Sequence, residues 1–387
     1  MRKNDLVLIN GQIKAILHAE KAKNPSYVHI DWLRFTVFTR NATPSEICFP
    51  PPVDFYEDLQ EEHYAVASQA AQVAWDVAAI LGPDFSVDLQ HRKGVDFYAW
   101  RYDILRHGSP VGWVGFLSTS KGFKGEAQAR TIHTNLEGMA CTFASSGWRE
   151  KMADYIDQHQ GLITRIDLAV DFFDGIKNGI ERLPDEYKAG VMDHLGQRPA
   201  HDLKGTWCFG EKTPNKGRSF YVGTRQSGKQ TNVYEKGLQL FGAESGNPWV
   251  RFELRYGNQL RLLRTDMLRH PADFFAGASK WHAAILAEAG ASAVAIPIKQ
   301  EKPLPIQTIE AEVERNARWF LHTAGASFRL AFNYLEENRL VDLLEDASAI
   351  PGRLKKFSEQ ELKKVYSNVF KRVSQNGQAS AFSFCPV

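Results

Sequence analysis

Alternating acidic and basic residues make the segment 164–171 the part of the chain best suited to chemistry. Its sequence is Thr-Arg-Ile-Asp-Leu-Ala-Val-Asp. If this segment is a β-strand, alternation places Arg165, Asp167 and Asp171 on one face and the isoleucine, leucine and valine on the other. We expect the apolar face to cover a core and the carboxylates to face a cleft or solvent.

A second segment, residues 249–256, repeats this arrangement with the sequence Trp-Val-Arg-Phe-Glu-Leu-Arg-Tyr. Arg251, Glu253 and Arg255 would share one strand face, and the apolar residues would share the other. Two such strands side by side would form a cluster of acids ringed by arginines.

A third carboxylate, Asp31, lies in the predicted strand 27–38. Strict alternation puts it on the same face as the apolar residues at 33, 35 and 37. A carboxylate there is costly unless it is paired or bound to a metal, so Asp31 is a candidate site residue. The alternative is that Asp31 ends the strand and caps a turn.

Two tyrosines lie in a predicted hairpin formed by residues 219–225 and 231–236, with a glycine in the connecting loop. Their strand faces carry, in order, Tyr221, Gly223 and Arg225, and Asn232, Tyr234 and Lys236. A tyrosine hydroxyl, with a reference pKa of about 10, needs a nearby cation or metal to act as a nucleophile. Joined to the acids, these faces would suit phosphoryl transfer. Carboxylate clusters select Mg²⁺ or Mn²⁺, which would polarise a phosphate while Arg or Lys stabilises the developing charge.

A structural interpretation of the same residues stays open. Tyrosine is common in strands, and alternating arginine and acid can form a ladder of cross-strand ion pairs. The chain has no Walker phosphate loop, no G-x-S-x-G elbow, no H-E-x-x-H motif, no dinucleotide fingerprint and no His-hydrophobic-His triplet. His133 lies on a predicted central strand, where a structural role is favoured.

Composition indicates an ordinary globular protein. The chain has 387 residues, is 43% hydrophobic and carries a formal net charge of +2, so it is not a polycation. Basic residues gather between residues 202 and 269 and again between 353 and 372, although such runs are more often solvated faces. The four cysteines have no C-x-x-C spacing, which predicts free thiols. No apolar run reaches a membrane-spanning length, and we expect a soluble, cytoplasmic protein.

The elements needed to position these residues predict an α+β fold, in which a central, mainly antiparallel sheet has helices on one face and is followed by a helical C-terminal region. Helices are expected at 56–80 and 152–158, and further strands at 95–102, 112–116 and 130–135. Three prolines mark residues 295–307 as a linker between a domain at 1–294 and a region at 308–387. The helices expected in that region, at 308–322, 327–346 and 358–373, form either a DNA-binding helix-turn-helix or a plain helical cap.

Four of these segments, in this order, resemble the motifs of Rep-trans type rolling-circle replication initiators. These proteins occur in filamentous phages, in small plasmids and as relaxases of integrative conjugative elements. The segments are 30–36, 164–171, 220–225 followed by 233–237, and 249–255. The resemblance covers roughly residues 25–270, and each motif is modest alone, whereas four in order are specific.

The resemblance implies a metal-dependent, site-specific DNA nickase. A tyrosine would attack an origin phosphodiester, leaving a 5′-phosphotyrosyl link and a free 3′-hydroxyl, and the same site would later rejoin the strand. The family's acids correspond to Asp31, Asp167 and Glu253, with Asp171 close by, as ligands of Mg²⁺ or Mn²⁺. Gly223-Thr224-Arg225 replaces the usual G-S-R and keeps a hydroxyl.

The residues assigned to catalysis are Tyr234, Tyr221, Lys236 and Arg225. Tyr234 is the favoured nucleophile, since Lys236, two residues on, would stabilise the phenolate. The predicted DNA contacts are Arg165, Arg218, Lys229, Arg251 and Arg255.

Expected partners are the origin, as a double-stranded hairpin and as a single strand, and a host helicase; no membrane is expected. The alternative is a catalytically silent DNA-binding protein that kept this scaffold for origin recognition or regulation.

Overall fold

The computed structural model divides the chain into two compact units, Met1–Gln300 and Glu301–Val387. In the first unit it describes residues 3–300 except 25, 46–60, 121–122 and 209–215. In the second it describes residues 313, 316–317, 319–334, 351–352, 354–355, 357–363 and 365–366. The division lies inside the segment predicted as a linker, whose bounds stay a prediction.

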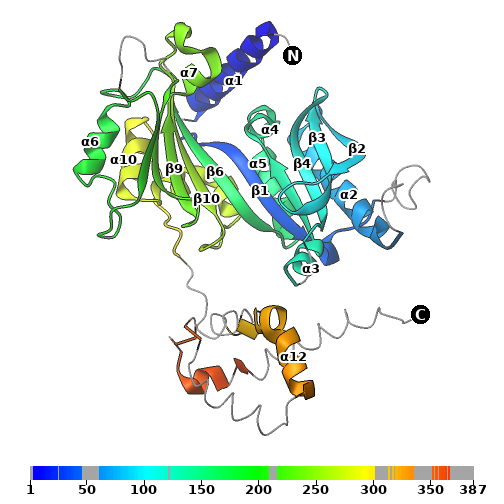
Figure 1. The fold of residues 1–387 in the computed structure, drawn as a ribbon. Coiled ribbons are helices and arrows are strands. Elements are labelled where there is room, and N and C mark those ends of the chain that lie inside the picture. Colours follow the sequence, from blue (N-terminus) through cyan, green and yellow to red (C-terminus); the bar gives the residue numbers. More distant parts are fainter. Residues whose placement is uncertain are drawn as a thin grey trace. The chain divides into compact units, whose positions relative to one another are not determined.

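A ten-stranded sheet forms the body of the first unit, with the strand order β2-β3-β4-β5-β1-β6-β10-β9-β8-β7 (Figure 1). All neighbouring strands are antiparallel. The sheet and its helices confirm the predicted α+β class. The strands are β1 (His29–Phe38), β2 (Phe85–Lys93), β3 (Tyr98–Arg106), β4 (Ser109–Ser118), β5 (Thr131–Leu136), β6 (Leu162–Phe172), β7 (His201–Gly205), β8 (Arg218–Thr224), β9 (Lys229–Tyr234) and β10 (Val250–Gly257).

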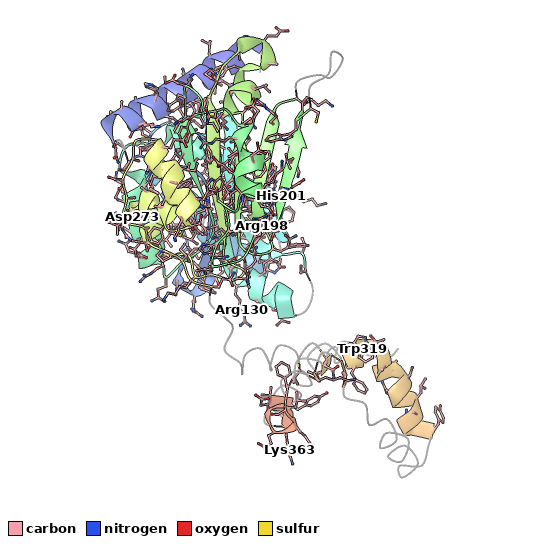
Figure 2. All side chains as sticks on the ribbon, turned by 90° about the vertical axis from the view of Figure 1, so that its left-hand side faces the viewer. Arg130, Arg198, His201, Asp273, Trp319 and Lys363 are labelled. Atoms are coloured by element: carbon pink, nitrogen blue, oxygen red, sulfur yellow. The ribbon has the colours of Figure 1, made fainter. Side chains whose placement is uncertain are left out.

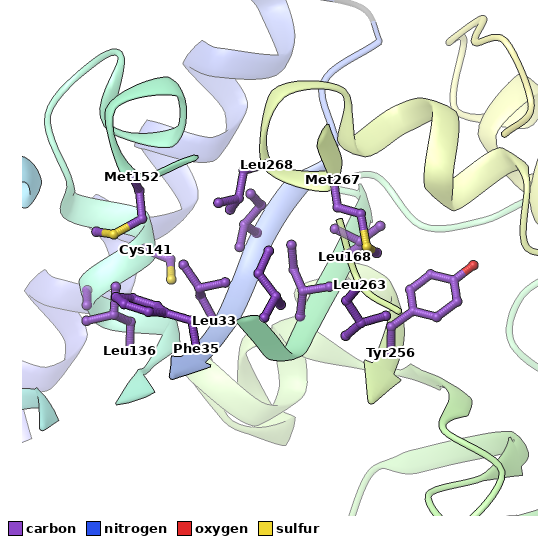
Figure 3. Close-up of a cluster of buried hydrophobic side chains, with 14 of the residues drawn as sticks. Leu33, Phe35, Leu136, Cys141, Met152, Leu168, Tyr256, Leu263, Met267 and Leu268 are labelled. Atoms are coloured by element: carbon purple, nitrogen blue, oxygen red, sulfur yellow. The ribbon is translucent and has the colours of Figure 1, made fainter. Parts of the chain in front are cut away.

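Helices on one face of the sheet enclose the main core. α2 (Tyr64–Leu81), α5 (Trp148–Gln158), α8 (Asp266–Arg269), α9 (Pro271–Ala276) and α10 (Lys280–Glu288) share one cluster with the apolar strand residues. Figure 3 shows Met152 of α5 and Met267 and Leu268 of α8 above Leu33 of β1 and Leu168 of β6. In α2, buried alanines at 67, 70, 71 and 74 form one helix stripe, whose small side chains permit close packing on the strands.

The remaining helices lie outside this layer or at its margins. α1 (Lys3–Lys23) contacts α4 (Gly138–Phe143) and α7 (Lys236–Phe241), and a second cluster joins α1 to Phe173 and Trp249. The shorter helices are η1 (Thr39–Asn41), η2 (Glu61–His63), α3 (Phe123–Ala129), α6 (Arg182–Lys188) and η3 (Ala243–Ser245). At the sheet edge beside β7, Arg198 and His201, labelled in Figure 2, both contact the ring of Tyr187.

The predicted elements are mostly present, with shifted bounds. The strand expected at 95–102 is β3 at 98–106, and β2, β7 and α1 were not predicted. α1 was missed because its charged and apolar residues follow no clear helical stripe. The helix expected at 56–80 is described only from residue 61, as η2 followed by α2.

A β-bulge in β1 overturns the predicted position of Asp31. Ile30 pairs with Leu168 and Trp32 pairs with Asp167, so Asp31 is an extra residue between two successive pairs. The bulge breaks the alternation, and Asp31 and Trp32 both reach the polar face of the sheet instead of the apolar one. The expectation that Asp31 shares a face with Leu33 is therefore wrong.

In the second unit, a π-helix, Phe320–Ala324, leads directly into α12 (Gly325–Tyr334). The break predicted at 323–326 is thus helical. Val313, Leu354 and Val365 form a small cluster with Phe357, Leu362 and Tyr366. Residues 308–312, 335–346 and 367–373 of the predicted helices lie outside the described residues.

Two other expectations concern the cysteines and the membrane. Cys141 is a buried free thiol and Cys208 an exposed one. In the described part of the chain, no helix combines the length and apolar character that a membrane span requires.

Acid should destabilise this fold partly through His282 of α10. Its ring nitrogens lie 2.8 Å from Thr231 Oγ1 and 2.7 Å from Ser279 Oγ, and burial lowers its pKa to about 3. Between pH 6.5 and 3 the unfolded chain binds this proton and the folded chain does not, so unfolding becomes easier as the pH falls. Below pH 6.5, His282→Leu should reduce the pH dependence of the unfolding free energy by up to about 1.4 kcal/mol per pH unit. Urea titrations of both proteins at several pH values test this, and equal slopes would contradict it.

Candidate nucleic-acid processing site

The candidate site occupies the polar face of the sheet, opposite the main core. β6 lies between β1 and β10, and Ala169 of β6 pairs with His29 on one side and with Glu253 on the other. Ala169 is almost fully buried, and its small side chain leaves room for longer side chains from both neighbouring strands to meet above β6. The predicted acids therefore share one face, although arginines separate most of them.

Arg251 is the centre of this network. Its Nε donates to Asp171 Oδ1 at 2.8 Å, its Nη2 donates to Asp171 Oδ2 at 2.9 Å, and its Nη1 donates to Asp31. The Trp249 indole N–H donates to the same Asp171 Oδ1 at 2.6 Å. Burial opposes ionisation of Asp31, yet the Arg251 guanidinium and a hydrogen bond from His29 hold its pKa well below the usual range.

Asp167 is held by two other arginines. Arg165 donates to it through Nε at 2.9 Å and through Nη2, and Arg255 Nε lies 3.2 Å from its Oδ2. The Arg165 guanidinium also stacks over the Trp32 ring, 4.5 Å from the centroid. Asp167 is 1% exposed, so its charge is balanced by these neighbours rather than by water.

Glu253 has the least charge compensation of the four acids. Its contact with Arg255 is long, at 3.5 Å, and its Oε2 accepts a hydrogen bond from the Tyr234 hydroxyl at 3.2 Å. Burial, together with the charges of Asp31 and Asp167, raises its pKa to about 7. A buried carboxylate with this pKa, bonded to a tyrosine hydroxyl, is placed to accept the tyrosine proton.

Tyr234 and Lys236 are neighbours, although not on one strand as predicted. β9 ends at Tyr234 and Lys236 begins α7, with its Nζ 5.5 Å from the Tyr234 ring centroid. Burial, followed by the charge of Glu253, raises the pKa of Tyr234 well above 10. Burial and Glu253 therefore oppose ionisation of Tyr234, and the expectation that Lys236 favours the phenolate stays a prediction.

Tyr221 lies on the same face but farther from the acids. It pairs with Asn232, which in turn pairs with Glu253, so Asn232 separates the tyrosine from the carboxylate. Lys204 Nζ lies 4.9 Å from the Tyr221 ring centroid. The sheet thus brings Tyr234 into the acid network and leaves Tyr221 two strands away from Glu253.

The predicted metal ligands do not surround a common point. Among the residues that the structure describes, no group of three or more His, Cys, Asp and Glu side chains is placed to hold a metal ion. Asp171, Asp167 and Asp31 are all engaged by guanidinium groups, whereas Glu253 has only a long contact with Arg255. Carboxylate oxygens are the donor type that Mg²⁺ or Mn²⁺ prefers, so the use of such an ion stays a prediction.

The predicted DNA contacts separate into two groups. Arg251 is 1% exposed and its guanidinium is committed to two acids, so it cannot serve as a surface contact, and that prediction is wrong. Arg218 is mostly buried and donates to Glu181 and, at 2.7 Å, to Glu235. Arg165, Lys229 and Arg255 instead line a cavity, together with the predicted catalytic residue Arg225.

Sequence reasoning missed three polar residues of this site. His29 is buried, with Nε2 3.2 Å from Thr142 Oγ1 and 3.6 Å from Asp31. Trp249 was assigned to a strand without a role for its indole N–H. Asn232 Oδ1 is buried and has no hydrogen-bond donor among the described residues. The Asn232 position beside Glu253 could have been found from the hairpin register, whereas His29 depends on the bulge.

Comparisons with known proteins agree with the motifs. Residues 161–345, a little under half of the chain, match the family model Rep_trans, described as replication initiation factor. A solved structure titled as a rolling circle replication initiator protein from Geobacillus stearothermophilus is 18% identical, with a TM-score of 0.44, covering 70% of this chain and 98% of that one. No curated protein matches the sequence.

The family-model match associates residues 161–345 with DNA replication initiation. More narrowly, residues 161–345 are similar to the Rep_trans replication initiation factors, in agreement with the resemblance drawn from the four motifs. The match begins at Gly161, just before β6, and so includes both tyrosines and three of the four acids.

Removing the Arg251 guanidinium should destabilise the protein strongly. Arg251→Met keeps most of the volume but leaves the carboxylates of Asp31 and Asp171 buried without their main partner. The free energy of unfolding should fall by about 3–5 kcal/mol in urea titrations. Arg264→Met, at a side chain that is 69% exposed, is the matched control and should change it by less than about 0.5 kcal/mol. A loss below about 1 kcal/mol in Arg251→Met would refute the central role of Arg251.

Proposed function

We propose that this protein nicks and rejoins DNA at a rolling-circle origin through a covalent 5′-phosphotyrosyl intermediate, with Tyr234 as the nucleophile. The observation that carries the proposal is the hydrogen bond from the Tyr234 hydroxyl to Glu253, a carboxylate whose pKa is raised to about 7. Tyr221 pairs with Asn232, which lies between it and Glu253, so Tyr221 has no carboxylate beside it on the neighbouring strand.

In the proposed step, Tyr234 Oη attacks the phosphorus of a phosphodiester and its proton passes to Glu253. The P–O3′ bond breaks, and the 3′ oxygen takes up a proton to become the hydroxyl that primes synthesis. Lys236, beside the Tyr234 ring, supports the negative charge on the reacting oxygens. In rejoining, the 3′-hydroxyl attacks the phosphotyrosine and Tyr234 leaves as the phenol.

A divalent ion is part of the proposal. Mg²⁺ or Mn²⁺ bound by Asp31 and Glu253 would supply Lewis-acid activation of the phosphate. The support is the donor set: two carboxylates on strands that flank β6, with the pKa of Glu253 raised by burial and by the charge of Asp31. Asp167 and Asp171 instead hold the arginines in place, which is a positioning role.

The alternative remains a catalytically silent protein that binds origin DNA on this scaffold. Origin binding is the part of the function that replication initiation itself requires, and a host helicase is a proposed partner. One assay separates the two: incubation of supercoiled origin plasmid with the protein and Mg²⁺ or Mn²⁺. Nicked circles carrying covalently attached protein support the nickase, and bound but intact plasmid supports the silent protein.

Tyrosine-to-phenylalanine variants test the nucleophile, because they keep the ring and delete the hydroxyl. Tyr234→Phe should lose the covalent adduct by about 10³-fold or more, measured by denaturing gel shift of origin DNA. Tyr221→Phe is the matched control on the neighbouring strand and should retain the adduct. The reverse pattern would move the assignment to Tyr221, and an adduct formed by the double variant would exclude both tyrosines.

The pH dependence of adduct formation should follow Glu253. Since its pKa is about 7, the carboxylate is protonated below this pH and can neither accept the Tyr234 proton nor bind a cation. The single-turnover rate should therefore rise as the pH increases through about 7 and level off above it. Glu253→Gln should be slow at every pH, whereas Glu244→Gln, at an exposed carboxylate, should keep the parent profile. A rate independent of pH between 6 and 8 would contradict this role.

A further inference from the structure

A cavity of about 290 Å³ opens on the polar face, beyond the acids. It lies where β6 begins, β10 ends and the β8–β9 hairpin turns. Four arginines and one lysine border it, and no Asp or Glu does so among the described residues. The cationic residues are Arg34, Arg165, Arg225, Lys229 and Arg255.

Three of these arginines are fixed in position by acids that lie outside the cavity lining. Asp167 accepts hydrogen bonds from Nε and Nη2 of Arg165 and from Nε of Arg255, and Glu253 accepts one from Nη2 of Arg255. The Nη1 atoms of both arginines have no acceptor among the described residues. Arg34 donates through Nε to Asn135 and through Nη1 to Asp96 at 2.7 Å. Their orientation is set before any ligand arrives, which reduces the entropy cost of binding an anion.

The hairpin turn presents the fourth arginine, Arg225. The Gly228 N–H donates to the Arg225 carbonyl at 3.0 Å, and the Ser227 N–H donates to Thr224 Oγ1 at 3.1 Å. Gly228 has φ +65°, and a Cβ there would lie 2.8 Å from the Gly257 carbonyl oxygen, so the turn requires glycine. Arg225 is exposed at this turn, whereas Lys229 Nζ donates to the carbonyl of the core residue Ala278 at 2.8 Å and so points away from the cavity.

We propose that this cavity binds a backbone phosphate of the single DNA strand that Tyr234 attacks, downstream or upstream of the scissile linkage. Guanidinium groups that are held in orientation by acids outside the cavity lining are suited to a phosphodiester, whose oxygens accept paired N–H donors. The proposal rests on the proposed function, because it takes the strand in the site to be DNA.

The sheet register gives the separation between the two subsites. Gln230 lines the cavity and Tyr234 lies four residues further along β9, which corresponds to about 13 Å of strand. With a phosphate spacing of about 3.4 Å in a stacked strand, this is about four linkages, and fewer in an extended strand. The cavity therefore positions the strand through a phosphate at a fixed offset from the cut.

Binding measurements in the Tyr234→Phe background test the inference without requiring cleavage. The probe is a single-stranded origin oligonucleotide with one neutral methylphosphonate, moved along the strand one linkage at a time. At one linkage, the methylphosphonate should weaken binding roughly tenfold. We expect that linkage within about four of the cut, or of the centre of the protected segment if no cut is observed. Adding Arg225→Ala should remove that sensitivity and reduce the slope of log K against log salt by about 0.7.

Lys151→Ala, at an exposed lysine of α5 in the helix layer, is the matched control and should leave both readouts unchanged. The inference is overturned if no linkage loses its effect in Arg225→Ala, or if Lys151→Ala behaves like Arg225→Ala. A third result would also overturn it: inorganic phosphate binds the cavity, but the methylphosphonate has the same effect on DNA affinity at every linkage. That result would indicate a site for a free anion. Because this experiment measures binding and not cleavage, its outcome can be interpreted even if the protein fails to nick DNA.

Discussion

The buried guanidinium of Arg251 is the interaction on which the polar face depends. Two carboxylates from different strands, Asp31 and Asp171, cannot stay ionised away from water without a positive partner, and Arg251 reaches both. Isolated buried ion pairs seldom add net stability, so this cluster is better understood as a device that fixes geometry. It joins β1, β6 and β10 through side chains as well as through the backbone, and it sets the position from which Glu253 meets Tyr234.

Much of this arrangement could be predicted from the sequence, because two strands alternate cleanly. In β6 and β10, period-two patterns assign Asp167, Asp171, Arg251 and Glu253 to one face, and the structure agrees. The hairpin could be predicted for the same reason, from β-branched and aromatic runs around a glycine turn. In each case the local pattern and the tertiary environment point the same way.

The errors arose where one residue breaks the pattern. A single extra residue in β1 reverses the face of Asp31, and alternation alone cannot show where a bulge lies. The roles of the arginines could not be predicted either, since charge counts do not distinguish Arg251, which neutralises acids in the interior, from Arg225, which is exposed at a turn. That difference depends on strand order, and the order of ten strands is set by contacts between residues that are far apart in the sequence.

The network also explains why two tasks can coexist on one face. Arg251 fully engages Asp171 and Asp31, and Asp167 is shared by Arg165 and Arg255, so negative charge is compensated everywhere except near Glu253. The same Asp167 orients two arginines that line the cavity. One carboxylate therefore connects the two regions: it raises the pKa of Glu253 on one side and fixes the cationic side chains on the other. A change at Asp167 would disturb proton transfer and strand positioning together, whereas changes at Tyr234 or Arg225 would separate them.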